Sequence, residues 1–353
     1  MAPQSLDRAG ELVREAAPAY HYAIITDDVV GPLYASRVSA SFRDGRVDIF
    51  TVPTGERNKT RESWSLLTDQ LLTAGYGRDT TIVALGGGVV GDLAGFVAAT
   101  FMRGVPVVQL PTTLLAMIDA SVGGKTGVDT PAGKNLVGAF HPPSLVLSDP
   151  SVLTTLPTEQ LRSGLAEAIK HGVIADERYF ERIVADLPAL LARPSGAEML
   201  DLIARSVEIK ADVVARDERE SGVRKTLNFG HTLGHAMESE SGYQLLHGEA
   251  VAIGMVLESA LAERVGVADR GTTNRVRDAV ERAGLPASYP AGMNADRVLA
   301  STRSDKKARR GRAEFALPKR VGAMAGAETD WAVRVDEAAV LAVLGEKNVA
   351  IGQ

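Results

Sequence analysis

Half of the chain's six histidines fall between residues 231 and 247, and imidazole is a common protein ligand for transition metals. His231 and His235 are four residues apart, a spacing that places both rings on one face of a helix. His247 follows at the start of the next expected helix. The chain has no cysteine, so a metal would be held by His, Asp or Glu. The spacing predicts a metal site with His231 and His235 as a ligand pair; the alternative is a helix pair with satisfied core histidines.

A glycine-rich turn joins an expected strand at 81–85 to a helical pattern. Residues 86–92 are GGGVVGD. Glycines at such a turn let backbone N–H groups approach a pyrophosphate at the N-terminus of the helix. The spacing differs from the usual GxGxxG dinucleotide fingerprint. The segment is either an anion-binding turn or a site of tight strand-to-helix packing.

Polar and charged residues are also interleaved with glycines between residues 111 and 135. The segment contains PTT at 111–113, GGK at 123–125 and GKN at 133–135. Lys125 and Lys134 could each hold a phosphate as a point charge. The GxxxxGK[ST] spacing of a phosphate-binding loop is absent from this segment. The alternative is a solvated glycine-rich loop, although the apolar flanks favour burial.

Glu167 and Lys170 are three residues apart and share one face of an expected helix. Such a pair is often an ordinary surface salt bridge. The flanking residues Leu165 and Ile169 are apolar, which favours a buried pair. Three further basic residues are Lys210, Arg224 and Lys306. Each alone is typical of a solvated surface charge, and they indicate an anion site only if the fold brings them together.

The elements that must position these residues change character along the chain. In the first half, strands predicted at 22–25, 47–52, 81–85 and 105–110 alternate with helical patterns such as 60–74, which indicates a parallel α/β sheet. After residue 150, helices are predicted at 158–174, 179–187, 197–216, 226–239 and 248–265, with Pro188 as the end of the second. The only late strand predicted is 313–317. We therefore predict an α/β domain at 1–150 and a mainly α-helical domain at 151–353.

Composition excludes several classes of protein. The formal net charge of −5 argues against nucleic acid as the main partner, because phosphate binding needs a basic face. Residues 1–18 lack the apolar block of a signal peptide. The longest apolar stretch, 81–102, is interrupted by Asp92 and five glycines, so we expect a strand, a turn and a helix and no membrane partner. A cytoplasmic location is the resulting expectation.

Taken in order, these segments resemble the sugar phosphate cyclase superfamily, and specifically its 3-dehydroquinate synthase family. The resemblance covers about residues 24–335. It is carried by six blocks: ALGGGVVGDLAGFVAATFMRG (84–104), PTTLLAMIDASVGGKTGVDTPAGKNLVGAFHPP (111–143), GLAEAIKHGVI (164–174), DERESGVRKTLNFGHTLGHAMES (217–239), LHGEAVAIGM (246–255) and SDKK (304–307).

The resemblance implies a Rossmann-like, α/β NAD-binding domain followed by a mainly α-helical domain that binds metal and substrate. It implies a divalent metal, most often zinc with cobalt as an alternative, held by Glu167, His231 and His247, so that His235 changes from ligand to catalytic group. Implied catalytic residues are His235, Lys170, Asn228, Lys210 and Arg224. Implied substrate contacts are Asp119, Lys125, Asn135, Lys170, Lys210, Arg224, Lys306 and Arg103. Implied NAD contacts are Asp27, Glu56, Lys59, Gly88, Asp92, Thr112, Thr113, Lys125, Lys134 and Thr155.

The implied reaction converts 3-deoxy-D-arabino-heptulosonate 7-phosphate to 3-dehydroquinate and phosphate, a step of the shikimate pathway to aromatic amino acids. NAD oxidises a secondary alcohol, phosphate is eliminated, NADH returns the hydride, and the opened ring closes by an intramolecular aldol reaction. Arg103 would reach the substrate of a neighbouring subunit, which implies a homodimer.

Three other functions are compatible with parts of this pattern. A sister cyclase would act on sedoheptulose 7-phosphate, or on an amino-substituted analogue of the substrate as an amino-dehydroquinate synthase. A metal-dependent alcohol or glycerol dehydrogenase shares the fold and would consume NAD stoichiometrically. A non-catalytic relative would be expected to have lost metal ligands. Lys210, Arg224 and Lys306 together favour a substrate that carries both a phosphate and a carboxylate.

Overall fold

The computed structural model describes residues 1, 3–43, 45–304 and 314–345. The chain forms two compact units, which are treated separately below. Met1–Pro157 and Arg193–Val207 make up the N-terminal unit, whereas Thr158–Ala192 and Glu208–Gln353 make up the C-terminal unit. A domain boundary at residue 150 stays a prediction.

The N-terminal unit is built on a five-stranded sheet with the order β2-β1-β3-β4-β7. All neighbouring strands pair in parallel, and Ile25 of β1 lies between Phe50 of β2 and Ala84 of β3. Every residue of β3 is buried, as expected for a parallel strand covered on both faces. The predicted parallel α/β sheet is therefore confirmed. The strands are β1 His21–Asp27, β2 Arg46–Val52, β3 Thr80–Gly86, β4 Val107–Pro111 and β7 Leu145–Val146.

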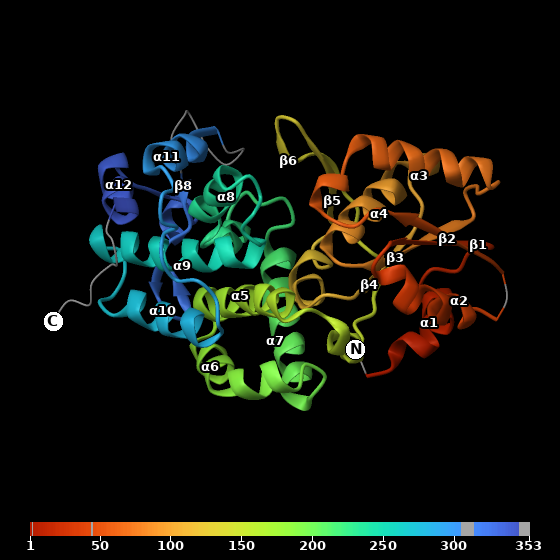
Figure 1. Ribbon diagram of the computed structural model, residues 1–353, viewed down its shortest axis with the longest axis horizontal. Helices are drawn as coiled ribbons and strands as arrows, with labels where there is room; N and C mark the ends of the chain where they lie inside the picture. Colours follow the sequence, from red (N-terminus) through yellow and green to blue (C-terminus); the bar gives the residue numbers. More distant parts are fainter. Residues whose placement is uncertain (2, 44, 305–313, 346–353) are drawn as a thin grey trace. The chain divides into compact units, whose positions relative to one another are not determined.

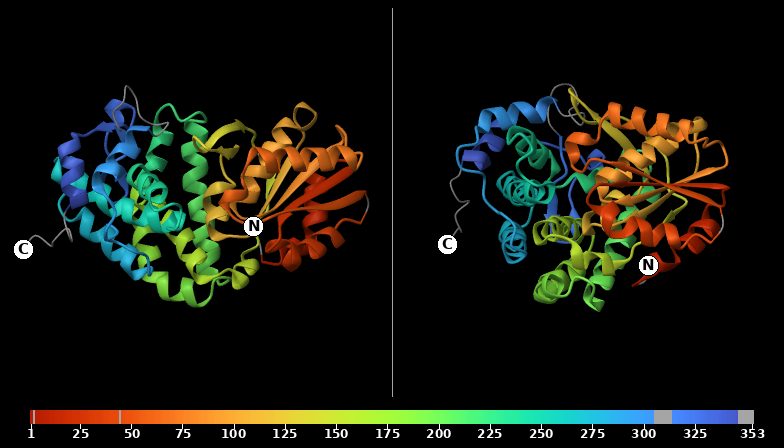
Figure 2. Two further views of the ribbon diagram at one scale, coloured as in Figure 1. Left: turned by 45° about the horizontal axis from the view of Figure 1, so that its top comes forward. Right: turned by 45° about the vertical axis from the view of Figure 1, so that its right-hand side comes forward.

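Helices cover both faces of this sheet, as the two views in Figure 2 show. α1 (Ala9–Ala16) and α2 (Ser36–Ala40) lie on one face, and α3 (Arg61–Thr73) and α4 (Gly88–Thr100) lie on the other (Figure 1). Leu67 of α3 and Leu93 of α4 share one buried apolar cluster with Ile25 and Ile82 of the sheet. Short helical turns complete the unit: η1 Ser5–Arg8, η2 Gly31–Ala35, η3 Glu56–Asn58, η4 Phe101–Arg103, η5 Ala116–Ala120 and η6 Pro150–Thr155.

The strand order reverses direction between β1 and β3. From β1 the chain moves outward to β2, and it then returns to place β3 on the opposite side of β1. The loops that leave the carboxyl ends of β1 and β3 therefore diverge, and in open α/β sheets ligands bind in the crevice that this divergence creates. Asp27 ends β1 and Gly86 ends β3, so both residues lie at this point.

Residues 125–140 form an antiparallel hairpin, β5 (Lys125–Thr130) and β6 (Gly133–Phe140), so a loop is wrong for them, although most of β6 is exposed to solvent. Gly127 and Gly138 are paired across the hairpin. A Cβ on Gly138 would lie 2.1 Å from the carbonyl oxygen of Thr126. The glycines therefore serve close backbone approach between strands, a use that resembles loop composition when only the sequence is seen.

The C-terminal unit is mainly helical, as predicted, and α9 is its central element (Figure 1). Nearly all of α9 is buried, and α5, α8 and α10 contact it. The helices are α5 Thr158–Ala175, α6 Glu177–Ala192, α7 Ala197–Arg216, α8 His231–Glu240, α9 His247–Arg264, α10 Thr272–Arg282, α11 Ala295–Ser304 and α12 Glu337–Gly345, of which α7 crosses the division between the units. Shorter elements are η7 Val223–Asn228, η8 Ala327–Thr329 and strands β8 Glu314–Phe315, β9 Pro318–Arg320, β10 Ala323–Met324 and β11 Val333–Arg334. Among the described residues, none of the helices combines the length and apolar character that a membrane crossing requires.

Two predicted helix limits are wrong. Pro188 does not end its helix, because α6 continues through it to Ala192. A proline leaves the carbonyl four residues earlier without its usual N–H donor, and here the Arg282 Nη2 atom donates to that carbonyl, Val184 O, at 3.0 Å. The helix predicted at 226–239 starts later, at His231, because Gly230 has a φ of 78° and interrupts the helical backbone.

Helices α8 and α9 cross at very short distance. A Cβ on Gly254 of α9 would lie 2.0 Å from the carbonyl oxygen of Gly230, and a Cβ on Gly234 would lie 3.0 Å from the carbonyl oxygen of Ala250. The glycines bring the two backbones together and leave no room for side chains at the crossing.

We therefore predict that Gly254→Ala lowers the free energy of unfolding of the protein by about 3 kcal/mol or more, because the new methyl group meets backbone that cannot move away alone. Chemical denaturation measures this change. Gly345→Ala is the matched control: Gly345 is also helical, and no atom lies within 4 Å of its Cβ position. The control should be neutral or stabilising by up to ~1 kcal/mol, since alanine is the better helix former. Equal effects of the two changes would contradict the proposed close contact.

Candidate functional site

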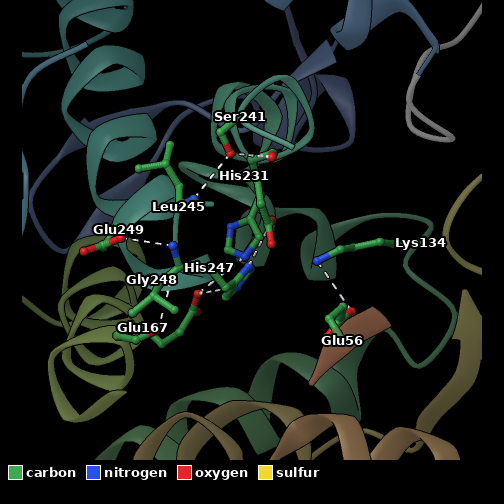
Figure 3. Close-up of polar contacts among 12 residues, drawn as sticks. Glu56, Lys134, Glu167, His231, Ser241, Leu245, His247, Gly248 and Glu249 are labelled. Atoms are coloured by element: carbon green, nitrogen blue, oxygen red, sulfur yellow. Dashed lines mark hydrogen bonds and ion pairs between the residues drawn. The ribbon is translucent and has the colours of Figure 1, made fainter. Parts of the chain in front are cut away.

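A fully buried carboxylate, Glu167 of α5, is the centre of a polar cluster in the C-terminal unit. Its Oε1 atom lies 3.5 Å from His231 Nε2 and 3.4 Å from His247 Nε2 (Figure 3). Its Oε2 atom forms an ion pair with Lys170, one turn along α5, whose side chain is also buried. The Glu167–Lys170 pair is therefore buried and not a surface salt bridge. Three helices, α5, α8 and α9, contribute to this cluster.

The spacing of these atoms suits a divalent cation. Ligand atoms bound to a tetrahedral zinc ion at about 2.0–2.1 Å lie about 3.3 Å from one another, close to both separations from Glu167 Oε1. One carboxylate with imidazoles is a donor set that zinc and cobalt accept. His231, His235 and His247 also have ligand atoms within 4.8 Å of one another. The cluster thus contains both predicted groupings, the helical pair and the Glu167 set, and the choice between them stays a prediction.

A hydrogen bond and a charged neighbour orient the two imidazoles that face Glu167. His231 Nδ1 lies 3.0 Å from the carbonyl oxygen of Phe229, and His247 Nδ1 lies 3.6 Å from Glu238 Oε2. Each contact leaves Nε2 directed at Glu167. Such outer partners are typical of histidines that bind metals. Sequence analysis missed Glu238, although it lies on the same helix as His231 and His235.

The two carboxylates also change the protonation of His247 in the metal-free protein. Burial alone would lower the pKa of His247, but hydrogen bonds and charge interactions with Glu167 and Glu238 outweigh it and raise the pKa to about 9. A bound cation would therefore take the place of a proton on this imidazole.

The loop before α8 is organised by Asp217, which sequence analysis also missed. Its Oδ1 atom accepts from the N–H and hydroxyl of Ser221 at 2.9 and 3.1 Å, and its Oδ2 atom accepts from the N–H groups of Gly222 and Arg224 at 2.7 and 3.0 Å. Burial alone would raise the pKa of Asp217, but these hydrogen bonds lower it to about 2. The carboxylate therefore fixes the backbone that carries Arg224.

The predicted anion-binding cations of this unit are buried. Lys210 of α7 is 7% exposed and Arg224 of η7 is 2% exposed, with Arg224 Nη1 donating to the carbonyl oxygen of Glu218. In the same loop, Asn228 Nδ2 donates to Glu220 Oε1 at 2.5 Å, and Glu220 has a left-handed φ of 60°. Glu220 was a further omission of the sequence analysis, and its presence in an acidic run was the available signal. Lys306 lies outside the described residues.

Lys59 of the N-terminal unit lies in one cluster with three other predicted cofactor residues, Glu56, Asp92 and Lys134. Lys59 Nζ lies 3.0 Å from Glu56 Oε1 and 3.1 Å from Asp92 Oδ2, and Lys134 Nζ lies 3.5 Å from Glu56 Oε1. Asp129 Oδ1, which sequence analysis missed, is 3.8 Å from Lys59 Nζ. Burial alone would lower the pKa of Lys59, but the three carboxylates raise it well above its ordinary value. Burial raises the pKa of Asp129 despite the opposing effect of Lys59.

Other predicted cofactor residues lie at the carboxyl ends of the strands. Asp27 Oδ1 accepts from the N–H groups of Val29 and Val30 at 2.9 and 2.7 Å, which fixes the turn after β1. Thr112 N donates to Gly86 O at 2.9 Å, so the ends of β3 and β4 are joined beside the start of α4. These positions coincide with the crevice expected from the strand order.

The remaining predicted residues of this unit are spread over separate elements, and their roles stay predictions. Thr155 Oγ1 lies 2.7 Å from the hydroxyl of Tyr34. Asn135 has a φ of 53°, and its N–H donates to Asp129 Oδ1 at 2.9 Å. The others are Gly88 at the start of α4, Arg103 at the end of η4, Thr113 after β4, Asp119 in η5 and Lys125 at the start of β5.

Comparison with known proteins gives one consistent result. The model described as 3-dehydroquinate synthase N-terminal matches residues 49–163, and the model described as 3-dehydroquinate synthase C-terminal matches residues 164–308. The 3-dehydroquinate synthase of Xanthomonas campestris pv. campestris is 46% identical over 356 residues, covering 98% of this chain and 94% of the relative.

Two solved structures extend the comparison to related cyclases. One is a 2-epi-5-epi-valiolone synthase from Streptomyces hygroscopicus subsp. jinggangensis 5008 with NAD+ and Zn2+ bound; its TM-score is 0.87 at 30% identity, over 98% of this chain and 94% of that chain. The other is a 2-deoxy-scyllo-inosose synthase complexed with carbaglucose-6-phosphate, NAD+ and Co2+; its TM-score is 0.86 at 25% identity, over 97% and 94%.

The Lys59 cluster generates a prediction on stability. Lys59→Met should lower the free energy of unfolding by about 3–5 kcal/mol, because it leaves the carboxylates of Glu56, Asp92 and Asp129 without their buried counter-charge. Lys134→Met removes a more exposed cation, whose Nζ lies 3.5 Å from Glu56 Oε1, and should cost about 1 kcal/mol or less. Denaturant unfolding of both variants at neutral pH checks this order. A Lys59→Met protein as stable as the Lys134→Met protein would contradict it.

Proposed function

The chain belongs to the 3-dehydroquinate synthase family, and from this membership we propose that its own residues convert 3-deoxy-D-arabino-heptulosonate 7-phosphate to 3-dehydroquinate and phosphate. The observation that carries the proposal at the site is the buried Glu167 carboxylate, whose Oε1 atom faces two imidazoles from two other helices. Family membership supplies the reaction, and this arrangement supplies a place for the metal that such a reaction needs.

A divalent cation, zinc or alternatively cobalt, held by Glu167, His231 and His247 would polarise the oxygen atoms at the reacting carbon, and NAD would take up and later return a hydride there. Lys170 pairs with Glu167 Oε2, whereas Glu167 Oε1 faces the imidazoles of His231 and His247, where the cation would lie. Because Glu167 and Lys170 are both buried, this division between the two oxygens is fixed by packing and not by solvent.

The substrate has two anionic ends, a phosphate and a carboxylate, and the chain provides buried cations to hold them. Lys210 and Arg224 are nearly fully buried, so their charges act with little screening by water. The fork of the arginine matches a carboxylate or phosphate in two hydrogen bonds, whereas the lysine acts as a point charge. Asp217 accepts from the backbone N–H of Arg224 and so fixes the point from which the arginine side chain extends.

We assign proton transfer to His235, which lies beside the two proposed histidine ligands. Its ring centre lies 5.1 Å from that of His231 and 5.7 Å from that of His247. Imidazole titrates near neutral pH, so His235 can accept a proton from a substrate hydroxyl and give it back. Asn228, fixed by its hydrogen bond to Glu220, would orient a substrate oxygen.

We place NAD at the carboxyl ends of β1, β3 and β4. The start of α4 presents backbone N–H groups of the glycine-rich turn, and its partial positive charge favours a pyrophosphate. Asp27, Thr112 and Thr113 lie beside this turn, and the Lys59 cluster supplies fixed charges from the same unit. The chain lacks the GxGxxG fingerprint at this turn, but NAD binding does not depend on it here, because the strand order itself creates the crevice.

We also propose that the enzyme is a cytoplasmic homodimer in which Arg103 contacts the substrate of the partner subunit. In support, Arg103 is exposed and has a left-handed φ of 74°, a backbone conformation that non-glycine residues rarely adopt without a structural reason.

The central experiment supplies 3-deoxy-D-arabino-heptulosonate 7-phosphate with a divalent metal and NAD far below the substrate concentration. We expect one phosphate and one cyclic product for each substrate consumed, with no net NADH, because the hydride is returned. Absence of phosphate release would reject the proposed reaction. Accumulation of NADH would identify a dehydrogenase, and turnover of sedoheptulose 7-phosphate or an amino analogue in place of this substrate would identify a sister cyclase.

The ligand set is tested by His247→Ala. We expect the variant to lose bound metal and at least ~100-fold of its activity together, since one of three ligands and the partner of Glu238 are removed. Metal content by mass spectrometry and phosphate release measure the two effects. His21→Ala, which changes a histidine of the N-terminal unit paired with Asp79, is the control and should keep both. Full metal occupancy in His247→Ala would count against His247 as a ligand.

A further inference from the structure

We propose that Glu258, a carboxylate inside the helical unit, is a positioning residue that sets where His231 lies relative to His247 by capping α8 from the neighbouring helix α9. The inference rests on the proposed metal centre. Glu258 does not belong to the predicted ligand set, and its role would be exerted through the backbone of α8.

Glu258 caps the N-terminus of α8 although it lies on another helix, α9. Glu258 Oε2 accepts from the N–H of Gly230 at 2.7 Å, and Glu258 Oε1 accepts from the N–H of Leu233 at 2.9 Å. The first N–H groups of a helix have no acceptor within the helix. In most helices the N-cap residue's own side chain accepts from one of them. Here the N-cap is Gly230, which has no side chain, and Glu258 takes over that role.

The close helix crossing explains why the cap cannot be local. Gly230 has a φ of 78°, and a Cβ there would lie 2.5 Å from Met255 Cγ and 2.9 Å from the carbonyl oxygen of Val251. A serine, threonine or aspartate therefore cannot occupy the N-cap. Val251, Gly254, Met255 and Glu258 recur at spacings of three and four, so one face of α9 provides both the tight contact and the cap.

The two hydrogen bonds from the start of α8 to Glu258 connect the helices that carry the two histidines facing Glu167. His231 is the first residue of α8, directly after the capped Gly230, and His247 is the first residue of α9, the helix that bears Glu258. The side chain of His231 is then fixed further by Nδ1 contact with Phe229 O at 3.0 Å. A shift of the α8 start along α9 would move His231 Nε2 relative to His247 Nε2 and Glu167.

A purely stabilising role is the competing explanation. A buried carboxylate costs free energy unless it is fully hydrogen-bonded, and apolar residues often stabilise a core as well or better. Glu258 has no exposed surface, and both of its oxygens accept from N–H groups at the start of the helix that carries His231 and His235. We therefore expect its loss to change metal geometry in addition to stability.

The test is Glu258→Gln in protein reconstituted with Co2+. Glutamine keeps the volume but offers one acceptor oxygen in place of two, so one of the two N–H groups loses its partner. We expect Co2+ affinity, measured by competition with a chelator, to fall about 10- to 100-fold, and the visible absorption bands of bound Co2+ to change in position or intensity. Wild-type affinity and an unchanged spectrum would overturn the inference.

Asp149→Asn is the matched control. Asp149 is a buried carboxylate of the N-terminal unit that accepts from the N–H groups of Gln4, Leu6 and Ser151. Asp149→Asn should lower the stability of the protein and leave the Co2+ spectrum and affinity at wild-type values. If it alters the spectrum as strongly as Glu258→Gln does, the effect is merely structural and the inference is overturned.

Two outcomes separate this inference from the proposed function. Wild-type protein without specific Co2+ bands would reject the metal centre and the inference with it, whereas intact wild-type bands that persist in Glu258→Gln reject the inference alone. If Glu258→Gln does not fold, Glu258→Asp keeps both acceptor oxygens on a shorter side chain. Weakened Co2+ binding in that variant supports the positioning role, and wild-type binding overturns it.

Discussion

A carboxylate without exposed surface must be balanced by positive charge or by hydrogen bonds, and Glu167 is the clearest case in this protein. Lys170 meets one oxygen from the same helix, and the imidazoles of His231 and His247 face the other from α8 and α9. Three helices must therefore pack so that their polar groups arrive at one point. Burial alone would lower the pKa of His247, but Glu167 and Glu238 raise it, and a divalent cation bound here would take the place of the proton.

In the N-terminal unit the buried charge is a cation, and carboxylates balance it. Lys59 is buried, and Glu56, Asp92 and Asp129 surround its ammonium group. Burial of one cation among three carboxylates leaves net negative charge for other groups to meet, and Lys134 is already one of them. As the proposed cofactor site, this cluster would have fixed charges before any ligand binds, so little reorganisation would accompany binding.

Several residues with no proposed catalytic role determine where the site residues lie. Gly230, Gly234 and Gly254 let α8 and α9 approach at backbone distance, and Asp217 ties the loop of Arg224 through hydrogen bonds to main-chain N–H groups. Glu258 closes the helix end that the glycine at the N-cap leaves open. Close backbone contact and capping are thus two parts of one arrangement: the glycines that permit the approach also remove the side chain that would cap α8.

Features that depend on local spacing could be predicted from the amino-acid sequence. Alternating apolar runs and helical patterns predicted the parallel sheet and the helical second half, because their periods are set by neighbouring residues. His231 and His235 were placed on one helix face for the same reason. The local patterns misjudged Pro188, whose helix continues because Arg282, distant in sequence, donates to the carbonyl of Val184. They also did not predict the 125–140 hairpin, whose glycines resemble loop composition. Only the packed structure shows that Asp129 meets Lys59 and that Glu258 caps α8, and it brings together Glu167 and His247, which the family resemblance had grouped but local spacing could not. These contacts join residues with no local periodic relation, so only the packing of whole helices and strands brings them together.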